Sequence, residues 1–513
     1  MDFFFSPTLL RARTKGYNLS MEKYIIAIDQ GTTSTRAILI SNKGEELEMA
    51  QRPLDCLYPE PGWVEQDPDQ LWVSAVDVIN ELMIKANITY EQVAGFGITN
   101  QRETTIVWDK KTGKAIYPAI VWQSRQTQPI CQRYMDKDEF IRSRTGLRIN
   151  PYFSASKIRF ILEKVPGAEE KMNKGELMFG TVDSWLIYKM TKGNHYTDVS
   201  NASRTLLFNI FTMDWDDELC AIWGINKNML PKVLDNSADY GEASFFRGHI
   251  HIYGVAGDQQ AALFGQCCFD KGDSKNTYGT GCFMLMNIGE KPIISKNGLL
   301  TTVGWRIGGK TTYALEGSVF IGGAAVQWLR DEMDWFKDSS MCEEYAQRKP
   351  DTNGVYVVPA FVGLGTPYWD DDARGAIFGL TRGADRHNIT RATLYSIAYQ
   401  SRDVFETMIK DSGLPLKTLR VDGGASANCL LMQFQSDILQ CEVSLPKCIQ
   451  TTALGAGYLA GLACGFFTDY KDILASHKEA KRYTPKMEKA EAESLYEGWV
   501  EAVKATRAYK PKH

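Results

Sequence analysis

Apolar residues in this chain form short runs that alternate with longer segments of helical spacing. Ile25–Ile28 and Ala37–Ile40 are two such runs joined by a polar turn, which predicts a strand, a tight turn and a second strand. Gln70–Ala86 instead has its apolar residues on one side at the spacing of a helix. Further strands are expected at Ala94–Thr99, Thr104–Trp108 and Ile250–Ala256. Strands that alternate with helices predict an α/β protein.

The turn between the first two predicted strands consists of glycine and small hydroxyl residues, Gly31-Thr32-Thr33-Ser34. Asp29 precedes it and Arg36 follows it. The backbone N–H groups and hydroxyls of such a turn can hold the terminal phosphates of a nucleotide, while the carboxylate faces their magnesium ion. Taken alone, the segment fits an ordinary hairpin equally well.

Three later segments repeat this combination of an apolar run and a glycine turn. Asn276–Ile288 places Gly279-Thr280-Gly281 between two apolar runs, as in the first turn, which predicts two halves of related design. Gly257 and Asp258 lie where a predicted strand runs into a helix. Asp422–Asn428 ends an apolar strand and opens a helix at Cys429–Ile438. Glycine lets the backbone approach a flat ligand closely there, because it has no Cβ.

One further motif fits a nucleotide-binding pattern by spacing alone. Gly304–Thr311 matches the P-loop pattern, which requires a preceding strand and a helix that begins at the lysine. Here Lys310 is followed by Thr-Thr-Tyr-Ala-Leu, which is typical of a strand. We therefore expect Ile307–Lys310 to form a hairpin turn and not a P-loop.

Composition narrows the classes of function. The chain has 513 residues, too many for one core, so two or three domains are expected. A formal charge of −4 gives no reason to expect nucleic-acid binding. No apolar run reaches the roughly 18 residues of a membrane span, so stable membrane insertion is not expected. The 11 cysteines contain no C-x-x-C pair, which favours reduced thiols and a cytoplasmic location. Residues 1–20 are expected to be a disordered N-terminal extension.

Together, Asp29–Arg36, Gly257–Gln260, Tyr278–Phe283 and Asp422–Asn428 resemble the FGGY carbohydrate kinases. Four longer motifs resemble the glycerol kinases of that family: Pro61–Glu65, Gly97–Thr105, Asn201–Thr205 and Trp369–Gly383. The resemblance covers residues 22–505. It implies an α/β fold of two actin-like (ribonuclease H-like) domains that flank a nucleotide and substrate cleft. Residues 21–267 would then form the N-terminal domain, which binds glycerol and phosphate, and residues 268–513 the C-terminal domain, which binds adenosine.

The resemblance implies an ATP:glycerol 3-phosphotransferase, which makes sn-glycerol 3-phosphate and ADP in the first step of glycerol breakdown. Asp258 would be the general base that accepts a proton from the attacking hydroxyl. A helix N-terminus should favour its ionised form. By position alone, Asp258 is more simply explained as an N-cap. ATP and Mg²⁺ are the expected cofactors, and a homodimer or homotetramer is the expected assembly.

The site residues implied by the resemblance fall into four groups. The contacts to glycerol hydroxyls are Arg102, Glu103, Tyr152, Asp258 and Gln259, and the walls against its carbon chain are Trp122 and Phe283. The phosphate contacts are Thr32, Thr33, Ser34, Arg36 and Thr280. The adenosine contacts are Gly323, Gln327, Gly424 and Asn428. Asp29 would hold Mg²⁺, through water, because Mg²⁺ keeps much of its hydration shell.

Two alternatives stay open at the level of sequence. Another polyol or sugar kinase of the same family would need extra polar groups in place of Trp122 and Phe283, to meet extra hydroxyls. A non-enzymatic ATP-binding module or chaperone of the actin-like fold would not need the set of Arg102, Glu103, Tyr152 and Asp258.

Overall fold

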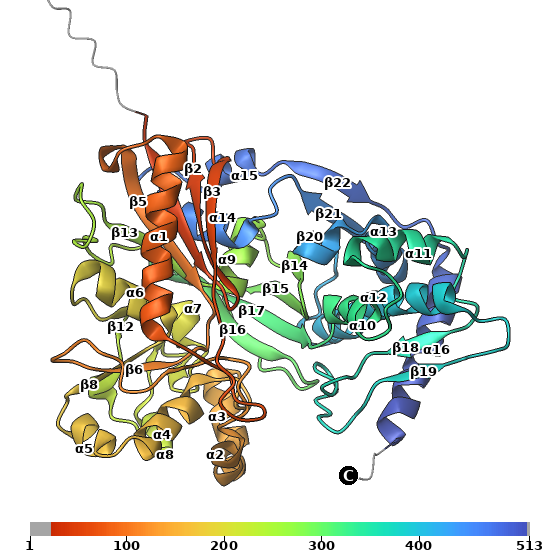
Figure 1. The fold of residues 1–513 in the computed structure, drawn as a ribbon, viewed down its shortest axis with the longest axis horizontal. Coiled ribbons are helices and arrows are strands. Elements are labelled where there is room, and N and C mark those ends of the chain that lie inside the picture. Colours follow the sequence, from red (N-terminus) through yellow and green to blue (C-terminus); the bar gives the residue numbers. More distant parts are fainter. Residues whose placement is uncertain (1–21, 510–513) are drawn as a thin grey trace, which may run out of the picture.

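Two β-sheets, one in each half of the chain, organise the computed structural model, which describes residues 22–509. In Figure 1 the two halves form two lobes, with the N-terminal half in red to yellow and most of the C-terminal half in green to blue. The predicted N-terminal extension, residues 1–20, lies outside the described residues.

The first sheet has five strands in the order β13-β5-β1-β2-β3. Their bounds are β1 (Tyr24–Gln30), β2 (Ser34–Ile40), β3 (Glu46–Pro53), β5 (Val93–Asn100) and β13 (Ile252–Gly257). The first three strands form an antiparallel meander, and β5 and β13 run parallel to β1. Helix α1 (Pro68–Ala86) packs against this sheet through its apolar side, as its spacing predicts. The helix starts at Pro68 because the Asp67 side chain caps it, accepting the Asp69 N–H at 2.9 Å.

The second sheet has seven strands in the order β16-β17-β15-β14-β20-β21-β22. Their bounds are β14 (Ser274–Tyr278), β15 (Cys282–Gly289), β16 (Leu300–Ile307), β17 (Lys310–Val319), β20 (Thr418–Asp422), β21 (Glu442–Pro446) and β22 (Glu479–Tyr483). Its five inner strands repeat the first sheet: an antiparallel meander of β14, β15 and β17, and then β20 and β21 parallel to β14. The predicted two halves of related design are confirmed by this shared order.

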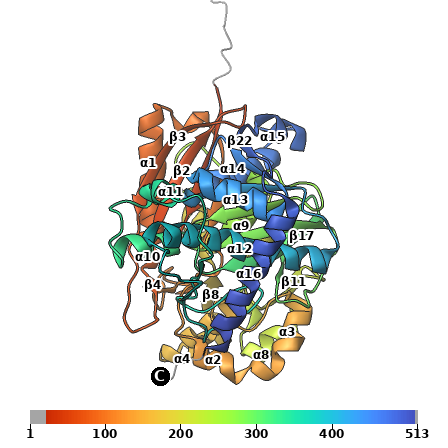
Figure 2. The same ribbon diagram turned by 90° about the vertical axis from the view of Figure 1, so that its right-hand side faces the viewer.

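Helices cover the outer side of the second sheet. Figure 2 shows α12 (Arg386–Ser412), α13 (Cys429–Leu439) and α16 (Lys489–Ala508) on the side of the C-terminal lobe that faces away from the first sheet. Apart from α14 (Thr451–Ala463), the remaining α-helices of this half are α10 (Gly323–Asp331), α11 (Cys342–Gln347) and α15 (Tyr470–Ser476), and its short strands are β18 (Tyr356–Val358) and β19 (Ala376–Phe378).

One helix of the C-terminal half packs on the first sheet. α14 (Thr451–Ala463) contacts β1, β5 and β13, and it crosses α9 (Asp258–Gly265) at very close range. A Cβ atom on Gly455 would lie 1.8 Å from the Ala261 carbonyl oxygen, so the two backbones can meet only through glycine. This crossing ties the two halves together beside Asp258. The division into domains at residues 267 and 268 stays a prediction.

The lower part of the N-terminal lobe in Figure 1 contains small elements inserted between β5 and β13. The helices are α2 (Gln128–Arg133), α3 (Asp138–Thr145), α4 (Ser154–Lys164), α5 (Ala168–Asn173), α6 (Val182–Thr191), α7 (Val199–Ala202) and α8 (Asp217–Trp223). The strands are β6 (Ile106–Asp109), β7 (Ala119–Ile120), β8 (Leu177–Gly180), β9 (Tyr196–Asp198), β10 (Phe208–Asn209), β11 (Asp214–Trp215) and β12 (Lys232–Leu234); β7 pairs with β4 (Glu65–Gln66). The strand predicted from Thr104 begins only at Ile106, because the Thr104 hydroxyl instead donates to Gln101 at 2.7 Å in a buried turn.

The P-loop-like segment is a hairpin, as predicted. β16 and β17 pair antiparallel with Ile307 opposite Lys310. Gly308 and Gly309 form the two-residue turn with φ of 56° and 77°, the left-handed region that such a turn requires. Lys310 therefore starts a strand, and the P-loop interpretation is wrong for this segment.

All 11 cysteines are free of disulfides. Within residues 22–509, no helix is long and apolar enough to span a membrane.

Candidate active site

The predicted glycerol contacts follow the carboxyl ends of neighbouring parallel strands. Asn100, the last residue of β5, pairs with Gln30 of β1 and with Gly257 of β13. Arg102, two residues after Asn100, and Asp258, directly after Gly257, therefore emerge at the same edge of the sheet. Ligands of open α/β sheets bind at this edge.

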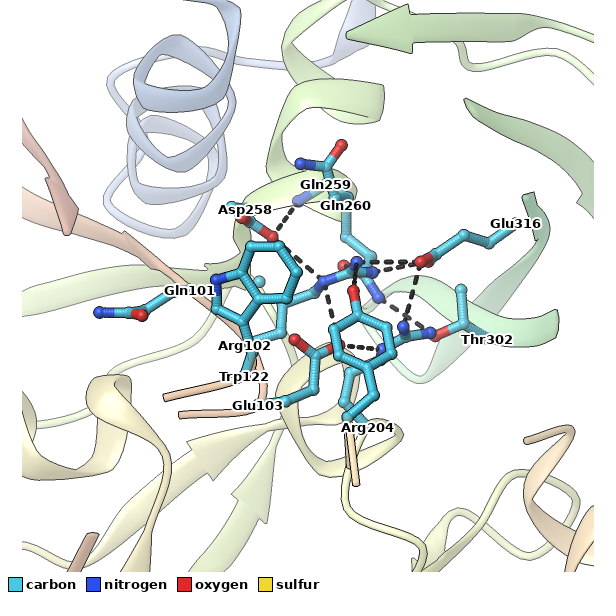
Figure 3. Close-up of polar contacts among 12 residues, drawn as sticks. Gln101, Arg102, Glu103, Trp122, Arg204, Asp258, Gln259, Gln260, Thr302 and Glu316 are labelled. Atoms are coloured by element: carbon cyan, nitrogen blue, oxygen red, sulfur yellow. Dashed lines mark hydrogen bonds and ion pairs between the residues drawn. The ribbon is translucent and has the colours of Figure 1, made fainter. Parts of the chain in front are cut away.

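Arg102 is the centre of a buried ionic cluster (Figure 3). Its two terminal nitrogens contact the two carboxylate oxygens of Glu316, Nη1 at 2.6 Å and Nη2 at 2.9 Å. Its Nε lies 3.1 Å from Oδ1 of Asp258. Arg204 adds a second guanidinium, which donates to Glu103 at 2.7 Å and to Glu316 at 3.0 Å. Arg102, Arg204, Glu103 and Glu316 are each at most 2% exposed, so these charges depend on one another for stabilisation.

Asp258 is the first residue of α9, and 31% of its side chain is open to solvent. Gly257 occupies the N-cap position, and the Asp258 carboxylate accepts the N–H of the adjacent Gln259 at 2.7 Å. The plain N-cap explanation is therefore wrong. Burial raises the pKa of Asp258 above its ordinary value, and the Arg102 guanidinium only partly offsets this. The predicted stabilisation of the ionised form by the helix N-terminus is outweighed by desolvation.

Three aromatic rings surround the space beside Asp258. The centroid of the Trp122 ring lies 5.6 Å from that of Tyr152 and 6.0 Å from that of Phe283, both edge-to-face. The Tyr152 hydroxyl accepts a hydrogen bond from Arg102 Nη2 at 3.1 Å. The structure thus brings together the two predicted walls and a predicted hydroxyl contact, although Phe283 comes from the second sheet.

Gln259 joins the same cluster through a lysine that the sequence did not single out. The Lys275 ammonium, on β14, donates to the Gln259 side-chain oxygen and to the Thr277 hydroxyl, the latter at 2.8 Å. Burial lowers the pKa of Lys275 to about 8.

The first glycine turn closes with a hydrogen bond from the Gly31 N–H to the Ser34 carbonyl at 3.0 Å, leaving Thr33 exposed. Asp29 and Arg36 pair across the turn, and Arg36 Nη1 lies 3.7 Å from Asp29 Oδ2. Burial raises the pKa of Asp29 to about 6, and the negative charge of Asp258 adds to the rise. A buried carboxylate near a second acid is a place where a cation would be stabilised.

The second glycine turn, Gly279–Gly281, is joined to the start of α10. The Thr280 carbonyl accepts the N–H groups of Gly322 and Ala324, and the Gly279 carbonyl accepts that of Gly323 at 2.9 Å. Gln327 is exposed one turn further along α10.

The third glycine cluster lies against the end of β14. Gly423 has φ of 87°, and a Cβ there would lie 2.5 Å from the Tyr278 carbonyl oxygen. The next residue, Gly424, has only open space where its Cβ would be. Asn428 accepts the Leu431 N–H at 2.9 Å and so caps α13. Gly424 and the Thr280 turn therefore lie at the same edge of the second sheet.

Three residues of the cluster were missed as site residues: Glu316, Arg204 and Lys275. Arg204 belongs to a motif of the family resemblance, but it received no role. The sequence signal that could have found Glu316 is a charged residue among apolar neighbours in a predicted strand, here Tyr313–Val319.

A cavity of about 330 Å³ is bordered by Gly44, Lys447 and Tyr458, and no predicted site residue borders it in the described part of the chain.

Comparison with known proteins decides the family. The N-terminal-domain model of the FGGY family of carbohydrate kinases matches residues 24–265, and the C-terminal-domain model matches residues 274–464. The chain belongs to the FGGY family of carbohydrate kinases. This FGGY kinase is 57% identical to the glycerol kinase of Bacillus licheniformis over 96% of its own length and 100% of that protein. It is 55% identical to the glycerol kinase of Bacillus subtilis, with the same coverage. These identities place the FGGY kinase among the glycerol kinases of the family.

Solved structures agree on the fold. The ADP complex of Plasmodium falciparum glycerol kinase superposes on this FGGY kinase with a TM-score of 0.89 and 36% identity, covering 94% of this chain and 98% of that one. A ligand-bound xylulose kinase from Lactobacillus acidophilus has a TM-score of 0.85 at 23% identity, covering 95% and 99% of the two chains, a likeness of fold alone. The predicted two-domain kinase fold is confirmed.

Proposed function

We propose that this FGGY kinase transfers the γ-phosphate of ATP to glycerol, giving sn-glycerol 3-phosphate and ADP. The observation that carries the proposal is the partly exposed carboxylate of Asp258, whose Oδ1 lies 3.1 Å from Nε of the buried Arg102 (Figure 3). The ring of Trp122 packs against Tyr152, which also contacts Arg102. This cluster combines a proton acceptor, a hydrogen-bond donor and an apolar wall, as the transfer to a small polyol requires.

Arg102 offers a free donor to the substrate. Among residues 22–509, its Nε makes no hydrogen bond of good geometry, although the atom is buried and Asp258 lies nearby. A buried donor without an acceptor costs free energy, and a glycerol hydroxyl would remove that cost. Glu103, Tyr152 and Gln259 then bind the remaining hydroxyls, and Trp122 and Phe283 pack against the carbon chain.

Asp258 serves as the general base. Its carboxylate accepts the proton of a terminal glycerol hydroxyl as that oxygen attacks the phosphate. The open third of its side chain provides access, and the raised pKa makes it a better proton acceptor than an ordinary aspartate. Asp258 acts as the base in its ionised form.

The two glycine turns hold the nucleotide. Thr32, Thr33, Ser34, Arg36 and Thr280 contact the phosphates, and Gly323, Gln327, Gly424 and Asn428 contact the adenosine. Arg36 supports this assignment, since within the described chain its buried Nε also makes no hydrogen bond and can donate to an anion. The open space beside Gly424 fits a flat ring that lies against the backbone.

Asp29 fits a magnesium ion that arrives with the nucleotide. Mg²⁺ is commonly held by one or two carboxylates together with substrate phosphates, and it keeps several of its waters. The Asp29 carboxylate is buried beside a second acid, and the ion pair that it makes within residues 22–509 is the long contact of 3.7 Å to Arg36, so a cation would stabilise its charge. When bound, Mg²⁺ neutralises charge on the phosphates during transfer.

Another polyol or sugar kinase of the FGGY family is the alternative. The aromatic walls favour glycerol, because Trp122 and Phe283 provide few groups that could bind further hydroxyls. The cytoplasmic location and the homodimeric or homotetrameric state expected from the sequence also remain proposals.

A coupled assay of ATP consumption across a panel of polyols and sugars tests the proposal. We expect kcat/KM for glycerol to exceed that for every longer polyol or sugar by at least about 10²-fold, because surplus hydroxyls would stay unpaired against the rings. A higher kcat/KM with a longer substrate would contradict it. Size-exclusion chromatography with light scattering would decide the oligomeric state.

A further inference from the structure

We propose that Glu316 is a positioning residue, which holds both terminal nitrogens of Arg102 and thereby keeps Asp258 free to act as the base. The inference rests on the proposed function, and it assigns a role to a residue outside the predicted substrate and nucleotide contacts. Glu316 acts through Arg102 and is not itself placed against the substrate.

Glu316 reaches Arg102 from the other sheet. It lies in the middle of β17, where its backbone pairs with Leu285 on one side and Leu300 on the other. Arg102 follows β5 of the first sheet, 214 positions away in the chain. Because both neighbours of β17 hold it in register, the Glu316 carboxylate has a fixed position relative to the second sheet.

Every oxygen of the Glu316 side chain is used. Oε2 accepts from Arg102 Nη1, and Oε1 accepts from both Arg102 Nη2 and Arg204 Nη2. The Arg102–Glu316 contact is the two-point pairing of a guanidinium fork with a carboxylate, the strongest geometry available to these groups. Glu316 is fully buried, so this pairing is little screened by solvent.

This arrangement decides which edge of the Arg102 guanidinium faces Asp258. With both terminal nitrogens on Glu316, Arg102 presents only Nε to Asp258, at 3.1 Å and without a well-formed hydrogen bond. Without Glu316, the fork could turn and pair with Asp258 at two points. An aspartate in such a pair has a lowered pKa and is a poor proton acceptor.

The surrounding charges support the same conclusion. The charged groups that face Glu316 are Arg102, Arg204 and Lys275. The groups that face Asp258 are Arg102, Glu103, Lys275 and Asp29. Removing the Glu316 charge leaves the cluster with an excess of cations, which further favours the ionised form of Asp258. Both effects lower the basicity of Asp258.

The test is Glu316→Gln, which keeps the shape of the side chain and removes its charge. We expect the KM for glycerol to rise by about tenfold or more, since the Arg102 donor is no longer oriented, while the KM for ATP stays within about twofold. The acid limb of the kcat–pH profile should move to lower pH, and kcat on the plateau should fall. A structural role alone would not move the acid limb.

Asp403→Asn is the matched control. Asp403 is a buried carboxylate on α12 that accepts from Tyr496 at 2.6 Å and from Trp499 at 2.9 Å. Its loss should lower the melting temperature without changing the glycerol KM or the acid limb. Glu316→Asp keeps the charge on a side chain too short to hold both nitrogens, so the glycerol KM should rise and the acid limb should move to lower pH by less than in Glu316→Gln. If Glu316→Gln does not fold, the glycerol KM and the acid limb of Glu316→Asp test the proposal, and wild-type values for both would overturn it.

The proposal is overturned if folded Glu316→Gln keeps the wild-type glycerol KM and acid limb. It is also overturned if the KM values for glycerol and ATP rise equally. Failure of the proposed function is a separate result, because it would appear as absence of turnover with glycerol in the wild-type protein.

Discussion

The indole N–H of Trp122 donates a hydrogen bond to the Thr32 hydroxyl at 2.8 Å. This contact joins a predicted wall of the glycerol site to the first glycine turn, which is predicted to bind phosphate. Gln66 also fixes Thr32, because the Thr32 carbonyl accepts the side-chain N–H of Gln66 at 2.7 Å. The position of the first glycine turn therefore depends on the predicted wall.

Trp122→Phe should separate these two roles, because phenylalanine keeps a ring but has no donor for Thr32. The loss of one hydrogen bond, about 1 kcal/mol, should raise the KM for ATP by about fivefold, with a smaller effect on the KM for glycerol. Steady-state kinetics with each substrate varied in turn measures the two effects. Trp185→Phe is the control, because its indole N–H donates to Pro68 at 2.8 Å outside the site. A larger effect on glycerol than on ATP would show that the contact to Thr32 is unimportant.

Asp258→Asn should lower kcat by at least about 10²-fold, as expected for loss of a general base. The amide keeps the shape of the side chain, so glycerol should still bind, as isothermal titration calorimetry can check. Asp216→Asn is the control, because Asp216 pairs with Arg144 at 3.0 Å in another part of the lobe. Near-normal turnover in Asp258→Asn would rule out this residue as the base.

The pH profile of kcat/KM for glycerol should also report Asp258, because kcat/KM depends on the ionisation of the free enzyme. The base must be ionised, so the rate should fall as the pH decreases through its pKa. Because burial raises that pKa, the acid limb should lie above the ordinary aspartate value of 3.8. Initial rates across the acid range measure the limb, and it should disappear from the residual activity of Asp258→Asn. An acid limb at or below pH 3.8 would show that burial does not raise the pKa of Asp258.

Asp29→Asn should stabilise the ligand-free protein while it impairs catalysis. The pKa of Asp29 is raised to about 6 in the folded state, so its ionised form destabilises the fold. Stability is lost as the pH rises from the unfolded value of 3.8 to about 6, and the loss is complete at neutral pH. Removing the charge should raise the melting temperature at neutral pH by about 2 °C or more. The value of kcat/KM for Mg-ATP should fall by at least about tenfold.

Differential scanning calorimetry of wild type and Asp29→Asn, both without ligand, measures the stability effect. A lower melting temperature in the variant would show that the Asp29 charge is stabilised by its contact with Arg36. An unchanged dependence of the rate on Mg²⁺ would contradict the role of Asp29 in holding the ion.

Lys310→Ala should leave the KM for ATP within about twofold of the wild type, because Lys310 is exposed next to a hairpin turn. Arg36→Ala is the informative comparison and should raise that KM strongly. A large rise for Lys310→Ala with an intact fold would restore the P-loop interpretation.

Local patterns determined the elements that carry the nucleotide turns. Alternation of apolar runs with glycine and threonine predicts strand, turn and strand at Ile25–Ile40, and the structure has β1 and β2 there. The same reasoning separated the true turns from the P-loop-like segment, because a P-loop needs a helix and Thr311–Leu315 is typical of a strand. These features depend on residues close in sequence, whose backbone preferences and hydrogen bonds are local.

Tertiary structure decided the ionic cluster around Arg102. The amino-acid sequence by itself determined the family and the two related halves, because these are expressed in contiguous motifs. It did not reveal the partner of Arg102, since Glu316 lies 214 positions away on a strand of the other sheet. Whether a buried carboxylate meets one guanidinium, two or none depends on how two separately formed sheets dock. The raised pKa of Asp258 likewise comes from its burial in the folded chain, which no local pattern contains.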